Sequence, residues 1–210
     1  MLKKYAVLQK ISEEKIVGII RVDTPEQAEK TVAALYEGGL RAIELSFTVP
    51  YAHTILAGLT QAYRGKMVIG AGTILDEATA RLAILSGAEF LVTPTVDVGV
   101  IRLANRYGIP CMSGVNTPTE LVTALENGVD VVKLFPAGNF KPGIIKDLKA
   151  PIPNAEIMAV GGVTRSNFKE WLDADAYACG VSGELVAGAK TGDYAAVTAA
   201  AKAFKEIVSR

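Results

Sequence analysis

Histidine is almost absent from this sequence, and charges of opposite sign are equal in number. The chain of 210 residues has a single histidine, His53. No group of His, Cys, Asp and Glu has the spacing of a metal site, so the sequence disfavours a metal-dependent reaction and a triad containing histidine. Lys and Arg total 22, as do Asp and Glu. Because no net field favours nucleic acid or a membrane surface, any bound anion must be held by local groups.

Long apolar runs and paired cysteines are also missing. No stretch is long enough to span a bilayer, and residues 1–15 carry charges where a signal peptide would have a continuous apolar core. The two cysteines, Cys111 and Cys179, lie in apolar strand-like runs with no paired spacing. We therefore expect buried free thiols in a reducing compartment, which indicates a cytoplasmic protein.

The sequence does contain a regular alternation of short apolar runs with longer amphipathic stretches. Half of the residues are hydrophobic and only 7% are aromatic, as in a compact globular protein long enough to bury a core. The runs are rich in Val, Ile, Leu and Ala, which is typical of strands buried on both faces of a parallel sheet. They occupy residues 16–20, 41–45, 67–72, 89–93, 109–113, 129–135, 156–161 and 176–181.

The stretches between these runs predict helices. Residues 24–39 have Thr24 as a cap, Pro25 in the first turn and Gly38 as a stop, and residues 75–87 and 117–128 follow similar patterns. Strict alternation of strand and helix predicts βαβ units, and eight of them favour a closed (β/α)8 TIM barrel over a doubly wound sheet. We expect this barrel, with an extra N-terminal helix, to form a single domain over residues 1–210.

Lys133 is the most informative residue, because it interrupts an apolar run near its end. Side chains alternate along a strand, so Lys133 shares a face with Val131 and Phe135. Burial there would disfavour the ammonium form, and a neutral amine is what attack on a ketone requires. The alternative is a lysine that reaches solvent from the end of a strand.

Glu44 and Arg21 also lie at strand ends. Glu44 alternates with Ile43 and Leu45, so it projects into the barrel if these apolar neighbours face the helices. A carboxyl in a partly apolar cavity can exchange protons near neutrality, although a buried salt bridge with Arg21 or Lys133 is the structural alternative. Arg21 ends the first run, and its planar guanidinium suits a 2-oxo acid carboxylate.

Glycines mark the remaining candidate positions. Thr73 follows Gly72 in a segment where the backbone can approach a ligand closely. Gly161 and Gly162 follow the seventh run, and Ser182 and Gly183 follow the eighth. Barrels often bind phosphate at this edge through backbone N–H groups, and tight turns without a ligand are the alternative.

These segments resemble a known enzyme family. The motifs RAIELSFTVP, VIGAGT, GAEFLVTP, SGVNTPTE, VVKLFPA and VGGV, in this order, are similar to those of the 2-keto-3-deoxy-6-phosphogluconate (KDPG) and 4-hydroxy-2-oxoglutarate (KHG) aldolases. The resemblance covers residues 12–205. It implies a homotrimeric class I aldolase of carbohydrate metabolism that needs no cofactor.

By this resemblance, Lys133 forms an iminium with C2 of pyruvate, and loss of a methyl proton then yields an enamine that adds to an aldehyde such as glyceraldehyde 3-phosphate. Glu44 matches the acid–base carboxylate and Arg21 the pyruvate-binding arginine. Thr73, Pro94 and Phe135 would line the pyruvate pocket.

The acceptor side departs from the family pattern. Val160 precedes the glycine pair where many members have threonine, and Ser182-Gly183 reverses the usual order. The sequence therefore leaves two alternatives to an aldolase that cleaves phosphorylated substrates or KHG. One is a phosphate-binding isomerase or synthase barrel, which gives Lys133 no task. The other is a non-catalytic barrel that binds a metabolite.

Overall fold

The computed structural model of the protein describes residues 2–209 and contains a closed barrel of parallel strands in the order β1-β2-β3-β4-β5-β6-β7-β8. The predicted (β/α)8 barrel is confirmed. The strands are β1 (Ile16–Ile20), β2 (Ala42–Ser46), β3 (Val68–Gly72), β4 (Leu91–Val92), β5 (Cys111–Val115), β6 (Val131–Leu134), β7 (Ile157–Val160) and β8 (Ala178–Val181).

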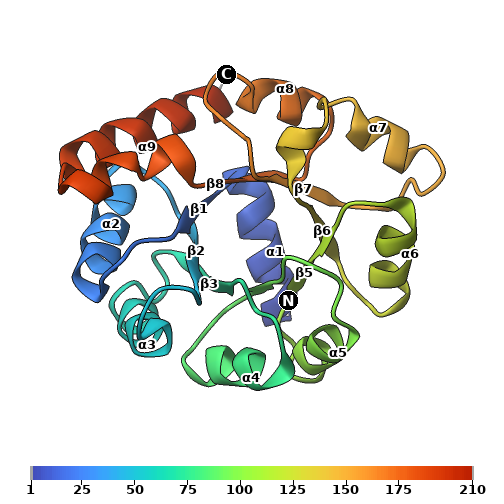
Figure 1. Cartoon of the computed structure of the whole chain (residues 1–210), viewed down its shortest axis with the longest axis horizontal. Helices are drawn as coiled ribbons and strands as arrows, with labels where there is room; N and C mark the ends of the chain where they lie inside the picture. Colours follow the sequence, from blue (N-terminus) through green and yellow to red (C-terminus); the bar gives the residue numbers. More distant parts are fainter. Residues whose placement is uncertain (1, 210) are drawn as a thin grey trace.

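Helices follow the strands and form a ring around the barrel (Figure 1). The α-helices are α1 (Lys3–Glu14), α2 (Pro25–Glu37), α3 (Ala52–Ala62), α4 (Glu77–Leu85), α5 (Val98–Arg106), α6 (Pro118–Glu126), α7 (Ile144–Lys149), α8 (Phe168–Asp173) and α9 (Tyr194–Val208). Short 3₁₀ helices are η1 (Ala137–Asn139), η2 (Gly183–Leu185) and η3 (Ala187–Thr191). Within residues 2–209, no helix is both long and apolar enough to cross a membrane.

The helix signals in the sequence act as expected. The Thr24 side chain accepts a hydrogen bond from the Gln27 backbone N–H, and Pro25 begins α2. The predicted fifth strand, residues 109–113, begins two residues later in the structure, because Pro110 has no N–H to donate to the sheet. His53 is exposed on α3.

Alternation along the strands divides the apolar residues into two layers. Ile43, Leu45 and Val132 belong to the large core between the barrel and its helices. Val17, Ile19 and their counterparts on other strands fill the barrel interior. The predicted parity of β2 and β6 is therefore confirmed, and polar residues on the inner face must lie in the barrel or at its mouth.

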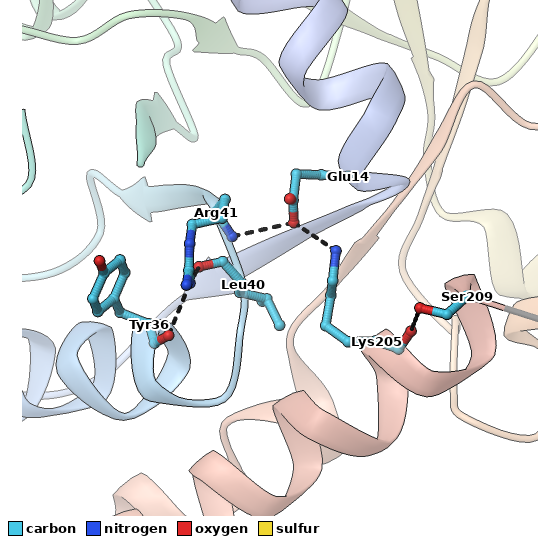
Figure 2. Close-up of polar contacts among 6 residues, drawn as sticks. All are labelled: Glu14, Tyr36, Leu40, Arg41, Lys205 and Ser209. Carbon is cyan, nitrogen blue, oxygen red and sulfur yellow. Dashed lines mark hydrogen bonds and ion pairs between the residues drawn. The ribbon is translucent and has the colours of Figure 1, made fainter. Parts of the chain in front are cut away.

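The expected N-terminal helix closes the end of the barrel opposite the strands' C-terminal ends. Val7 and Ile11 of α1 belong to the interior cluster, and the Tyr177 hydroxyl, just before β8, donates to the Leu8 carbonyl. Figure 2 shows a second attachment, in which the Glu14 carboxylate accepts the Arg41 backbone N–H and pairs with Lys205. The N-terminal end of the barrel is thus covered by α1, which leaves the opposite mouth for a ligand.

Candidate active site

A cavity of about 480 Å³ opens at the C-terminal ends of the strands, and we refer to it as the mouth cavity. This is the end at which barrel enzymes carry their chemistry. All of the site residues predicted from the sequence line the mouth cavity, namely Arg21, Glu44, Thr73, Pro94, Lys133, Phe135, Gly161, Gly162, Ser182 and Gly183.

Lys133 is buried inside this mouth rather than reaching bulk solvent. Its relative exposure is 5%, and its Nζ lies 4.8 Å from the centre of the Phe135 ring. The ring face offers an electrostatic contact for an ammonium group and also one apolar wall of the cavity. Among the described residues, Lys133 has no carboxylate within ion-pair distance, so its amine is available to a ligand.

Glu44 is the buried carboxylate of the same cavity. It is 1% exposed, and its Oε2 atom is buried without a hydrogen-bond partner within residues 2–209. Burial raises the pKa of the Glu44 carboxyl, and the positive charges of Lys133 and Arg21 offset part of this rise. The ion pair considered from the sequence is not formed, since neither cation lies within ion-pair distance of Glu44. An unsatisfied buried oxygen is costly and is common where a group serves a ligand.

The position of Glu44 depends on the absence of a side chain on β3. Glu44 pairs with Gly70 across the two strands. A Cβ on Gly72 would lie only 1.7 Å from Glu44 Oε1 and 2.2 Å from its Cδ. Gly72 therefore makes room for the carboxylate, which is a close-approach role rather than one of loop flexibility.

Arg21 reaches the cavity from the end of β1 and is hydrogen-bonded to the first of three connected hydroxyl groups. Its Nη2 donates to Thr73 Oγ1 at 3.4 Å. Thr73 Oγ1 lies 3.0 Å from Ser46 Oγ, which lies 2.8 Å from Thr48 Oγ1. Thr73 has φ 58°, a left-handed conformation that is strained for a β-branched residue. Such strain persists only where surrounding contacts hold it, as they do at many functional sites.

The opposite wall of the mouth cavity is built from backbone. Gly161 and Gly162 both have positive φ, 83° and 81°. A Cβ on Gly162 would lie 2.6 Å from Gly138 Cα, and the Gly138 N–H donates to the Gly161 carbonyl at 2.7 Å. Both glycines line the mouth cavity, where the absence of side chains lets a ligand approach the backbone closely.

Glu184 is an acidic residue of η2, shortly after β8. It lines the mouth cavity, and its carboxylate accepts the backbone N–H of Arg165. The Thr164 N–H is also occupied, because it donates to Asn167 Oδ1 at 2.8 Å. Two of the backbone donors after β7 are thus satisfied within the protein.

Part of this wall was not predicted from the sequence. Thr164 and Val163 line the cavity, but they lie in an irregular loop where alternation of side chains gives no direction. Their place directly after the Gly161-Gly162 pair was the one available signal.

Comparison with known proteins agrees with this geometry. A family model described as "KDPG and KHG aldolase" matches residues 7–200. The chain is 36% identical over 196 residues to the 2-dehydro-3-deoxy-6-phosphogalactonate aldolase of Escherichia coli (strain K12), covering 92% of this chain and 96% of that one. It is 34% identical over 180 residues to the 2-dehydro-3-deoxy-phosphogluconate aldolase of Haemophilus influenzae, covering 84% of each.

A solved structure described as native KDPGal superposes with a TM-score of 0.85 at 34% identity, covering 91% of this chain and 93% of that one. The family match spans nearly the whole barrel, and the relatives align over most of their lengths. The protein therefore belongs to the KDPG and KHG aldolase family.

Proposed function

We propose that Lys133 is the Schiff-base nucleophile of this aldolase, that Glu44 transfers the protons, and that Arg21 and Thr73 bind the substrate carboxylate. The observation that carries the proposal is the joint burial of one lysine and one unpaired carboxylate in a single cavity, at 5% and 1% exposure. Arg21 donates to the Thr73 hydroxyl in the same cavity, and each side chain has a further N–H or O–H to offer a carboxylate.

The chemistry proceeds through a covalent intermediate. Lys133 Nζ attacks the C2 ketone of the substrate, water leaves, and an iminium forms. Glu44 removes the proton of the C4 hydroxyl, the C3–C4 bond breaks, and its electrons move to the iminium to give an enamine and a free aldehyde. The proton returns to C3, and water then hydrolyses the resulting iminium to pyruvate and the free amine. A carboxyl with a raised pKa suits both directions of this transfer.

The substrates proposed are 2-keto-3-deoxy-6-phospho sugar acids and KHG. The two relatives named above act on phosphogalactonate and phosphogluconate derivatives. Their common feature is a 2-keto acid head with a hydroxyl at C4 and a terminal phosphate. The products are pyruvate and glyceraldehyde 3-phosphate, or glyoxylate from KHG.

Borohydride trapping tests this proposal. Incubation with pyruvate and borohydride should reduce the iminium and add a stable pyruvate-derived adduct to Lys133, which intact mass and peptide mapping would locate. A non-catalytic barrel, or an isomerase without a Schiff base, would remain unlabelled.

The phosphate is proposed to bind the backbone of Gly161, Gly162 and Gly183. At this wall of the mouth cavity, Val160 provides no hydroxyl group to a phosphate. Glu184 adds a negative charge, and its carboxylate accepts the Arg165 N–H, which is then not available to a phosphate. Phosphorylated substrates should therefore be favoured less strongly than a fully available anion site would allow. A wild-type specificity constant hundreds of times higher for the phosphorylated substrate than for KHG would contradict this expectation.

Replacement of Glu184 by Gln isolates the effect of its charge, because the amide oxygen can still accept the Arg165 N–H. We expect kcat/KM for the phosphorylated substrate to rise about two- to fivefold, as for removal of an exposed like charge. The value for KHG, which lacks the phosphate, should change little. Glu170→Gln is the matched control, since Glu170 is exposed on neighbouring α8. An unchanged ratio between the two substrates would remove Glu184 from substrate selection.

The assembly is proposed to be a homotrimer in the cytoplasm. Leu82 and Leu85 are exposed on one face of α4, and Tyr107 at the end of α5 lies near α4, stacked on Arg81. The mass in solution should be three times 22.1 kDa. Leu85→Glu should reduce this mass to that of one chain, and a wild-type protein with the mass of one chain would refute the trimer. The buried free thiols Cys111 and Cys179 are consistent with a reducing compartment.

A further inference from the structure

Ser46 is a fully buried hydroxyl that the proposed mechanism does not use. It ends β2, two residues beyond Glu44, and its relative exposure is 0%. In the register of the barrel Ser46 pairs with Gly72, which places it beside Thr73 at the end of β3. The Ser46 side chain therefore lies behind the cavity wall on which Thr73 and Arg21 are exposed to a ligand.

The donors and acceptors around Ser46 give the hydroxyl chain a direction. Arg21 has only donors, so Thr73 Oγ1 accepts from Arg21 Nη2. Ser46 Oγ accepts the Thr48 backbone N–H at 3.4 Å and lies 2.8 Å from Thr48 Oγ1 and 3.0 Å from Thr73 Oγ1. When Ser46 donates to Thr73, the second lone pair of Thr73 is used and its own O–H must turn elsewhere.

The free direction for that O–H is the mouth cavity, which Thr73 lines. A carboxylate accepts hydrogen bonds and donates none, so a ligand beside Arg21 selects the arrangement in which Thr73 donates to it. In the reverse arrangement Thr73 donates to Ser46 and offers the carboxylate only lone pairs. Hydrogen bonds in one direction also polarise each other along the chain.

We infer that Ser46 is a positioning residue for carboxylate recognition, which acts by orienting the Thr73 hydroxyl toward the substrate carboxylate next to Arg21. This inference rests on the proposed function, since it assigns the carboxylate to Arg21 and Thr73. It adds that the affinity for the 2-keto acid head depends on a hydroxyl that never touches the substrate.

The test compares wild type with Ser46→Ala, using two ketones in the borohydride reaction. Pyruvate has a carboxylate, whereas acetone has none, and both form an iminium by attack of the amine and loss of water. The Ser46→Ala protein should need about three- to tenfold more pyruvate for half-maximal trapping, as for loss of one neutral hydrogen bond. The acetone concentration needed for half-maximal trapping should be the same for Ser46→Ala as for wild type. In aldol cleavage, KM should rise by a similar factor while kcat stays within about twofold.

Thr31→Val is the matched control. Thr31 is equally buried, at 0% exposure, and its hydroxyl donates to the Gln27 carbonyl on α2, far along the chain from the mouth cavity. This variant removes one buried hydroxyl and should leave trapping by both ketones unchanged.

The outcomes separate the two proposals. If pyruvate fails to label the wild type, the proposed function is wrong. If the wild type is labelled and Ser46→Ala has the same half-maximal pyruvate concentration, the function stands and the role of Ser46 is refuted. If pyruvate and acetone trapping weaken equally, Ser46 supports packing around the amine and not carboxylate recognition, which also refutes the inference.

Discussion

Replacement of Lys133 by Ala should abolish both aldol cleavage and pyruvate trapping. The amine is the only group proposed to bond covalently to the substrate, and without it no iminium can store the electrons of the broken C3–C4 bond. Activity should fall to the detection limit, and the mass after borohydride treatment should remain that of the untreated protein. Near-wild-type cleavage by Lys133→Ala would refute the Schiff-base assignment.

Lys133→Arg provides the sharper version of this experiment. Arginine keeps the positive charge but stays protonated and cannot attack a carbonyl, so it should be as inactive as the alanine variant. Lys149→Ala serves as a control, because Lys149 is also partly buried, at 16% side-chain exposure, but pairs with Asp175 outside the barrel. Circular dichroism should show that all three variants are folded.

Replacement of Glu44 by Gln should reduce kcat by about 10²–10⁴-fold, the usual contribution of general acid–base catalysis. Gln keeps the shape of the side chain in the space that Gly72 leaves open, but it cannot accept a proton. Pyruvate trapping should persist with altered kinetics, since Lys133 is intact. Unchanged turnover would make Glu44 a structural residue. Glu89→Gln is the control, because Glu89 is a half-buried carboxylate at the opposite end of the barrel.

The same substitution predicts a dependence of stability on pH. Burial raises the pKa of Glu44 in the folded state above that of the unfolded chain. The folded protein then holds this proton more tightly, so its free energy of unfolding falls as pH rises from the unfolded pKa through the raised folded pKa. Glu44→Gln lacks this group, so the melting temperature of wild type relative to the variant should decrease over that interval. A constant difference would contradict a raised pKa.

Much of the fold and the inward placement of Lys133 and Glu44 could be read from the sequence, because both depend on local periodicity. Eight apolar runs separated by helical patterns admit few arrangements other than a barrel. The parity of β2 and β6 alone directs Glu44 and Lys133 to the inner face, and it needs no knowledge of neighbouring strands. The roles of these two residues stay predictions until the variants are measured.

Tertiary structure decided what depends on register and on loops. Arg21 and Thr73 are separated by 52 positions and meet only because the strand order places β1 and β3 on either side of β2. In the register of β2 and β3, Ser46 pairs with Gly72 and therefore lies next to Thr73. The periodicity within one strand does not contain this information. The contact of Glu184 with Arg165 joins two irregular loops whose conformations are set by long-range packing. Sequence alternation thus determined which side chains face the barrel axis, whereas strand register and loop packing determined which of them touch.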